Sequence, residues 1–226
     1  PGQLTQAAWT VLTAADEIYV RTAQHPTLAA LPSDLAVHSF DAIYAAAENF
    51  SQVYEQIVAE LISLARGRAE LVYAVPGDPA VGETTTGLLR ARAAAEGITV
   101  RVIHGVSFVE PSCLALGIDP LDTAGLQVLD AMVVAAGHAP GFDTARPALL
   151  AQCYSRSVAG DVKLTLLHSF PPDHPVTVLQ AAGTDAQTLR TLPLYELDRS
   201  AAFDHLTSLY VPPIGPYTSF TALQEI

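Results

Sequence analysis

The run Glu70-Leu71-Val72-Tyr73-Ala74-Val75 leads directly into the turn Pro76-Gly77-Asp78-Pro79. A short apolar run bounded by turn residues is typical of a strand that a parallel sheet buries on both faces. Residues 98–103 alternate as a second strand and run into the loop His104-Gly105-Val106-Ser107. A helix is predicted between the two strands, over residues 83–96. This order of elements predicts right-handed crossovers and a largely parallel sheet covered by helices.

The rest of the chain extends this pattern on one side and changes it on the other. Toward the amino terminus, apolar spacing predicts a helix over 4–15, a strand at 18–20, a polar, proline-broken stretch over 25–39 and a long amphipathic helix over 50–62. After Gly117 come apolar runs at 126–129 and 148–153, a helix over 155–168 and strand candidates at 176–181, 189–197 and 208–211. More strands and fewer helices predict a mixed, partly antiparallel sheet. We therefore expect an α/β protein with two subdomains, residues 1–110 with a mainly parallel sheet and residues 111–213 with a mixed sheet.

Composition restricts the class of protein and its partners. Of the 226 residues, 50% are apolar and 15% are charged, and 11 basic against 23 acidic side chains give a net charge of −12. No uninterrupted apolar run of about 18 residues is present, so no membrane span is predicted. The negative field repels phosphate backbones, which makes nucleic acid an unlikely main partner. Low charge on so apolar a chain predicts a homodimer, and light scattering that finds only a species near 23.8 kDa would contradict it.

Cysteine and histidine spacing argues against disulfides and metals. Cys113 and Cys153 lie far apart in apolar surroundings, and neither has a second Cys or His at metal spacing. The seven histidines form no metal-binding spacing either. We therefore expect no metal site and a reducing, cytoplasmic location.

The two loops are the candidate ligand-binding segments. In an open α/β sheet, ligands bind beyond the carboxyl ends of the strands, and both loops are expected there. Asp78 offers acceptors to hydroxyl or ammonium groups of a ligand, and we expect it to be hydrated in the free protein, so that Asp78→Asn changes stability by less than about 0.5 kcal/mol. Both loops are also consistent with ordinary turns, since Pro, Gly, Asp and Ser dominate turns. Ser107 stands in Gly-Val-Ser-Phe, which does not support a hydrolase nucleophile elbow.

Four motifs, in this order, resemble those of the tetrapyrrole (corrin and porphyrin) methylase superfamily. They are Pro1-Gly2, Gly77-Asp78-Pro79, Gly105-Val106-Ser107-Phe108 and Gly183-Thr184. A narrower likeness is to the methylase-like N-terminal domain of MazG-type nucleoside triphosphate pyrophosphohydrolase fusion proteins. The segments that carry it are Tyr73 to Gly77, Ser39-Phe40-Asp41 with Tyr44, Asp161 to Thr165 and Leu192 to Asp198. His205 to Pro213 resembles the linker that leaves that domain, so residues 214–226 are expected to lead toward a further domain.

The resemblance implies a cofactor, a reaction and a set of contacts. The cofactor is S-adenosylmethionine, or S-adenosylhomocysteine as its product, in a cleft between two α/β subdomains of the tetrapyrrole methylase type. The implied reaction is in-line transfer of the sulfonium methyl group to an unknown small or macrocyclic acceptor, which depends on positioning and exclusion of water. No universal catalytic residue is implied. The implied cofactor contacts are Pro1, Gly77, Asp78, Val81, Ser107, Phe108, Cys153, Tyr154, Ala182 and Gly183.

Four functions remain open from the sequence. The first is an S-adenosylmethionine-dependent methyltransferase, and the second is a non-catalytic ligand-binding or regulatory domain attached to a nucleoside triphosphate pyrophosphohydrolase. A dinucleotide-binding domain is disfavoured because no Gly-x-Gly-x-x-Gly opens a helix. Pyrophosphohydrolase activity needs paired acidic motifs for Mg²⁺ and a triphosphate, and the sequence does not provide them.

Overall fold

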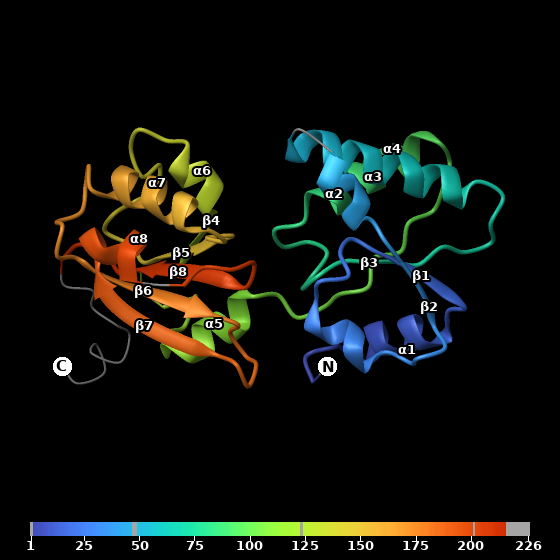
Figure 1. Cartoon of the computed structure of the whole chain (residues 1–226), viewed down its shortest axis with the longest axis horizontal. Helices are drawn as coiled ribbons and strands as arrows, with labels where there is room; N and C mark the ends of the chain where they lie inside the picture. Colours follow the sequence, from blue (N-terminus) through green and yellow to red (C-terminus); the bar gives the residue numbers. More distant parts are fainter. Residues whose placement is uncertain (1, 47–48, 123, 201, 216–226) are drawn as a thin grey trace. The chain divides into compact units, whose positions relative to one another are not determined.

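The computed structural model describes residues 2–46, 49–122, 124–200 and 202–215. The chain divides into two compact units, Pro1–Ser107 and Phe108–Ile226 (Figure 1). The sequence placed this division after residue 110, which lies within helix α5 (Val109–Leu116). Most of the predicted linker, residues 216–226, lies outside the described residues, as does Pro1.

The first unit contains a three-stranded parallel sheet in the order β2-β1-β3. Its strands are β1 (Glu17–Val20), β2 (Ala36–Ser39) and β3 (Tyr73–Ala74). Both pairings are parallel, as predicted, and they align Ile18 with Val37 and Tyr19 with Tyr73. Strand β2 falls in the stretch that we expected to be irregular. All four of its residues are exposed, so the sequence shows no alternation of apolar and polar residues from which the strand could be predicted.

Two long helices pack together on one side of this sheet, and a third lies on the other side (Figure 1). The helices of the unit are α1 (Gln6–Ala14), α2 (Asp41–Ala46), α3 (Phe50–Ala65) and α4 (Thr84–Ala95), with a short 3₁₀ helix η1 (Pro26–Ala30). Helix α3 begins where the Asn49 side chain accepts a hydrogen bond from the amide of Gln52 at 3.0 Å. One face of α3, with Val53, Ile57 and Leu61, packs on Tyr19 and Phe40 of the sheet region. The predicted helices over 4–15, 50–62 and 83–96 are thereby confirmed.

The predicted strand over residues 98–103 is wrong. No strand is assigned there, and the amide of Ile98 instead bonds the carbonyl of Ala93 at the end of α4. The end of this segment, at residues 104–105, is held by hydrogen bonds to side chains and not by pairing with a strand. The Thr5 hydroxyl donates to the carbonyl of His104 at 2.9 Å, and Asp78 accepts from the amide of Gly105.

The second unit contains a mixed sheet of five strands in the order β4-β5-β8-β6-β7. The strands are β4 (Gln127–Asp130), β5 (Ala148–Ala151), β6 (Pro175–Gln180), β7 (Thr188–Pro193) and β8 (Thr207–Val211). Only β4 and β5 run parallel, and the other three pairings are antiparallel. The predicted mixed sheet is confirmed. Strand β5 ends at Ala151, before Gln152, which has a φ of +62°. Strand β7 ends at Pro193, short of the predicted end at 197, because proline lacks the amide needed to extend a ladder.

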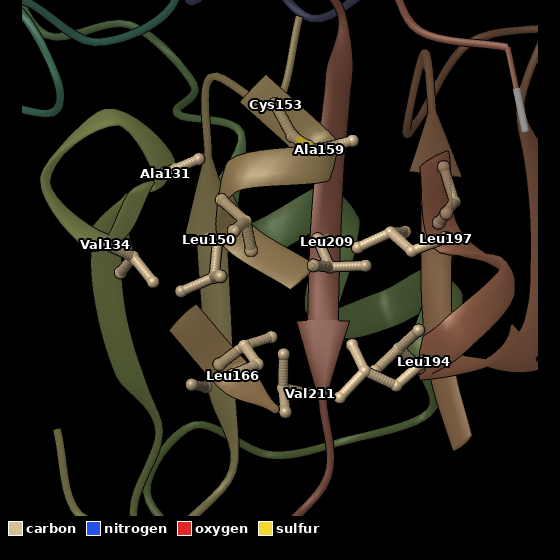
Figure 2. Close-up of a cluster of buried hydrophobic side chains, with 14 of the residues drawn as sticks. Ala131, Val134, Leu150, Cys153, Ala159, Leu166, Leu194, Leu197, Leu209 and Val211 are labelled. Atoms are coloured by element: carbon tan, nitrogen blue, oxygen red, sulfur yellow. The ribbon is translucent and has the colours of Figure 1, made fainter. Parts of the chain in front are cut away.

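The core of the second unit lies between this sheet and its helices. The helices that contribute to this core are α6 (Ala131–Ala135), α7 (Arg156–Leu166) and α8 (Leu197–Ser200), with a short 3₁₀ helix η2 (Leu194–Glu196). Figure 2 shows Leu150 and Leu209 of the sheet packed among side chains of the helices, such as Leu166. The helix predicted over 155–168 corresponds to α7, whereas α5 and α6 were not predicted. In the part of the chain that the structure describes, no helix has the length and apolar character to cross a membrane.

Candidate functional site

The carboxyl ends of the parallel strands in the first unit lead into polar segments. Strand β1 is followed by Arg21, β2 by Phe40-Asp41, and β3 by the turn Pro76–Pro79. The prediction that this turn follows a strand is confirmed. Ligands of open α/β sheets bind at the carboxyl ends of the strands, so this edge is the candidate site of the first unit.

The two candidate loops touch each other through their backbones. A Cβ built on Gly105 would lie 2.2 Å from the carbonyl oxygen of Gly77, a distance that real Cβ atoms do not show. Position 105 therefore requires glycine for space. Gly77 has a φ of +75°, a left-handed conformation that favours glycine for a different reason. Their geometry brings together two segments separated by a whole helix.

Asp78 joins the two loops. Its Oδ1 accepts from the amide of Ala80 at 2.7 Å, and its Oδ2 accepts from the amide of Gly105 and from His104 Nδ1, both at 3.1 Å. Burial raises the pKa of Asp78, but these hydrogen bonds lower it by more, so the pKa lies below its ordinary value of 3.8. The residue is 8% exposed. The expectation of a hydrated carboxylate is therefore wrong, because Asp78 is a buried link between loops.

Asp78→Asn is accordingly expected to destabilise the free protein by about 1 to 3 kcal/mol, because an amide cannot accept all three hydrogen bonds. The difference in free energy of unfolding between the two proteins should reach its full size above pH 3.8, the ordinary pKa. It should shrink as the pH falls through the lowered pKa of Asp78 in the folded state. The sign follows because folding lowers this pKa, so only the ionised form stabilises. Urea unfolding of both proteins at several pH values measures the difference.

The matched control is Asp34→Asn, which removes the same charge from an exposed turn. It should change the free energy of unfolding by less than about 0.5 kcal/mol. Equal stability of Asp78→Asn and Asp34→Asn near neutral pH would contradict the structural role of Asp78.

His104 is the exposed member of the pair with Asp78. Its side chain is 77% exposed, while the side chain of Asp78 is 11% exposed. Its backbone is held separately by the Thr5 hydroxyl. The ring is therefore held at Nδ1 by the Asp78 carboxylate, and most of the His104 side chain is open to solvent.

The other predicted contacts in and next to the first unit lie close to these loops in the chain. The amide of Val81 donates to the carbonyl of Asp78 at 3.1 Å, so Val81 closes the turn that begins at Asp78. Ser107 is buried, and Phe108 is the residue from which α5 starts. The predicted contact at Pro1 lies outside the described residues.

The predicted contacts in the second unit come from two loops. Cys153 follows β5 and is fully buried in the core, where burial raises the pKa of its thiol to about 12 (Figure 2). Its amide donates to the carbonyl of Thr207 at 3.2 Å, so neither the thiol nor the amide is free for a ligand. The hydroxyl of the neighbouring Tyr154 donates to Met132 Sδ at 3.5 Å. Ala182 is half-buried, and Gly183 has a φ of +76°, with its amide donating to Gln187 Oε1 at 2.7 Å.

A buried polar network that was not predicted lies near the same sheet edge. Arg21 Nη1 donates to Glu83 Oε2 at 2.7 Å, and the Glu83 side chain is 1% exposed. Glu83 also accepts from the amide and hydroxyl of Thr85, whose hydroxyl lies 2.9 Å from that of Tyr73. Burial raises the pKa of Tyr73 and brings that of the nearby Tyr44 to about 12. The only sequence signal was an arginine at a strand end and a glutamate at a helix start.

Comparison with known proteins identifies what this chain resembles. A model of tetrapyrrole (corrin/porphyrin) methylases matches residues 1–198. The uncharacterized protein YabN of Bacillus subtilis (strain 168) is 40% identical over 229 residues, which cover 99% of this chain and 46% of YabN. The chain therefore spans about half the length of this curated relative. Within the described ranges, no three His, Cys, Asp or Glu side chains gather in a way that could hold a metal ion.

Solved structures share the fold at low sequence identity. A cobalt-precorrin-4 methyltransferase has a TM-score of 0.67 at 16% identity, over 94% of this chain and 90% of its own. Diphthine synthase has a TM-score of 0.67 at 17% identity, over 99% and 88%. A uroporphyrin-III C-methyltransferase from Thermus thermophilus, complexed with S-adenyl homocysteine, has a TM-score of 0.64 at 17% identity, over 94% and 92%. The predicted α/β fold class is confirmed by these likenesses.

Proposed function

Because the chain belongs to the tetrapyrrole (corrin/porphyrin) methylase family, we propose that it binds S-adenosylmethionine and transfers its methyl group to a small or macrocyclic acceptor. The observation that carries the proposal is the contact between the loops of Gly77 and Gly105 at the carboxyl end of β3. The methyltransferases with the same fold, one of them complexed with S-adenyl homocysteine, support it. When bound, the cofactor supplies an electrophilic methyl group on a sulfonium.

The residues of the first unit fit such a ligand. Gly77 is exposed, has no side chain, and would let a ligand approach the backbone. Asp78 holds this loop against Gly105, and the buried Ser107 lies two residues further along the same segment. In this proposal the chain positions the ligand and excludes water, and the loop amides and carbonyls provide most polar contacts. The contacts predicted in the second unit, at Phe108, Cys153, Tyr154, Ala182 and Gly183, remain part of the proposal.

Calorimetry with S-adenosylmethionine and S-adenosylhomocysteine tests this proposal. We expect both to bind, and Gly77→Ala to weaken binding at least about tenfold, or 1.4 kcal/mol. Gly67→Ala is the matched control, since both glycines have positive φ, +75° and +81°, and neither has a neighbour within 3.4 Å of an added Cβ. Both variants should lose about 1 to 2 kcal/mol of stability, because each adds a Cβ in the left-handed region. If the folded wild-type chain binds neither compound, the proposal is wrong.

A second candidate is a non-catalytic, ligand-binding or regulatory role. We propose that the chain forms the methylase-like part of a MazG-type protein and that any pyrophosphohydrolase activity belongs to the rest of that protein. The support is the likeness of the segments around Tyr73, Asp161 and Leu192, together with the additional length of YabN. Binding without transfer of a labelled methyl group to any acceptor favours this regulatory role over an enzyme.

The surface of the second unit and the two cysteines bear on assembly and location. We propose a homodimer because the described part of the second unit exposes several large apolar side chains that association would remove from water, and three of them are exposed by 70% or more. Leu114 is 85% exposed, Leu121 90% and Val133 70%. We also propose a cytoplasmic location, which the two free cysteines, Cys113 and Cys153, support.

A further inference from the structure

The Asp78–His104 pair fixes the proton of an exposed imidazole. Asp78 is ionised near neutral pH because its pKa lies below 3.8, so its oxygens can only accept hydrogen bonds. The contact of 3.1 Å between Asp78 Oδ2 and His104 Nδ1 therefore requires the hydrogen to be on Nδ1. In the neutral ring the lone pair is then on Nε2. No described residue is bonded to this Nε2 atom.

This arrangement has the geometry of a general base. A carboxylate that is itself held by two backbone amides, those of Ala80 and Gly105, orients the imidazole and lies beside the ring that receives the proton. The same Asp78 clamps the two loops that we propose to hold the ligand. His104 thus places a proton acceptor at the edge of the candidate site, in a position that a solely structural clamp does not need.

We propose that His104 is the proton acceptor of the methyl-transfer reaction and that Asp78 is its positioning residue; this rests on the proposed function. The acceptor is then a nucleophile that carries an O–H or N–H group. Its lone pair forms the new bond to the methyl carbon, and the carbon–sulfur bond breaks with its electrons remaining on sulfur. The O–H or N–H proton moves to His104 Nε2, and the positive charge of the sulfonium ends on the imidazolium facing Asp78.

His168 provides a matched control within the same chain. It is also exposed, and its Nδ1 lies 2.9 Å from the carbonyl oxygen of Leu164 and 3.3 Å from that of Thr165, so its hydrogen is likewise fixed on Nδ1. Its partners are neutral carbonyls in the last turn of α7 and not a carboxylate between ligand loops. Both residues are therefore exposed and have the same tautomer, and they differ in their place in the fold.

The test labels both rings with diethyl pyrocarbonate and follows each by mass spectrometry, with and without S-adenosylhomocysteine. At about ten times its Kd, S-adenosylhomocysteine should slow labelling of His104 about tenfold, since only the free protein reacts, and labelling of His168 should stay unchanged. Nitrogen-15 spectra should show the Nδ1–H tautomer of His104 in the wild type and a mixture of tautomers in Asp78→Asn. The tautomer of His104 distinguishes a positioning role of Asp78 from a role in stability alone.

Two results would overturn the inference while leaving the proposed function intact. One is binding of S-adenosylhomocysteine by calorimetry with no change in labelling of His104. The other is a nitrogen-15 spectrum of the wild type that shows the hydrogen of the neutral His104 ring on Nε2, which would leave no lone pair on that atom to accept a proton. A wild-type chain that binds neither S-adenosylmethionine nor S-adenosylhomocysteine would instead reject the proposed function itself.

Discussion

Gly105→Ala is expected to destabilise the protein by roughly 3 kcal/mol, at the upper end of what overpacking usually costs. The added Cβ would lie 2.2 Å from the carbonyl oxygen and 3.0 Å from the carbonyl carbon of Gly77. These atoms belong to the backbone, so no side-chain rotation can relieve the clash. The two loops must move apart, which also breaks the hydrogen bond from the Gly105 amide to Asp78. Urea unfolding measures the stability, and calorimetry on the folded fraction should find no S-adenosylhomocysteine binding.

Gly87→Ala is the control for this substitution. Gly87 lies within α4, and a Cβ added there meets nothing within 4 Å. Alanine is the better helix former, so this variant should gain about 0.5 to 1 kcal/mol and bind ligand as the wild type does. A Gly105→Ala protein as stable as the wild type would show that the two loops do not touch in solution.

Local sequence patterns predicted the elements that depend on local signals. Helix α3 was predictable because apolar residues such as Val53, Ile57 and Leu61 recur at helical spacing. Strand β6 was predictable for the corresponding reason, since its residues form a compact apolar run between turns. Strand β2 was not, because a short strand with four exposed residues has no hydrophobic face to read.

The candidate site shows a similar division. Glycines at 77 and 105 marked the two loops in the sequence, because glycine is needed where a backbone turns sharply or approaches another chain segment. The burial of Asp78 could not be read from its neighbours, since two of its partners, His104 and Gly105, are 26 and 27 residues away. The Arg21–Glu83 pair spans 62 residues and was missed for the same reason.

Glu83→Ala is expected to destabilise the protein by about 3 kcal/mol, because it leaves a partly buried guanidinium without its carboxylate. The Arg21 side chain is 24% exposed, which keeps the expected loss at the lower end for a buried ion pair. The Nε atom of Arg21 is already buried without a partner among the described residues, so the guanidinium has little else to bond. The loss also removes the acceptor for the amide of Thr85 at the start of α4. Urea unfolding at neutral pH measures the effect.

The contribution of the charge pair is separated from that of the cap by a double-mutant cycle and a surface control. In the cycle, Glu83→Ala in an Arg21→Met background should cost clearly less than in the wild type, because no unpaired cation remains. Glu55→Ala removes a carboxylate of the same kind from the exposed pair with Arg92, whose two side chains are 60% and 45% exposed. It should change stability by less than about 1 kcal/mol, as is usual for surface pairs. Equal losses for Glu83→Ala in both backgrounds would mean that Arg21 gains nothing from Glu83. The cost would then come from the helix cap alone.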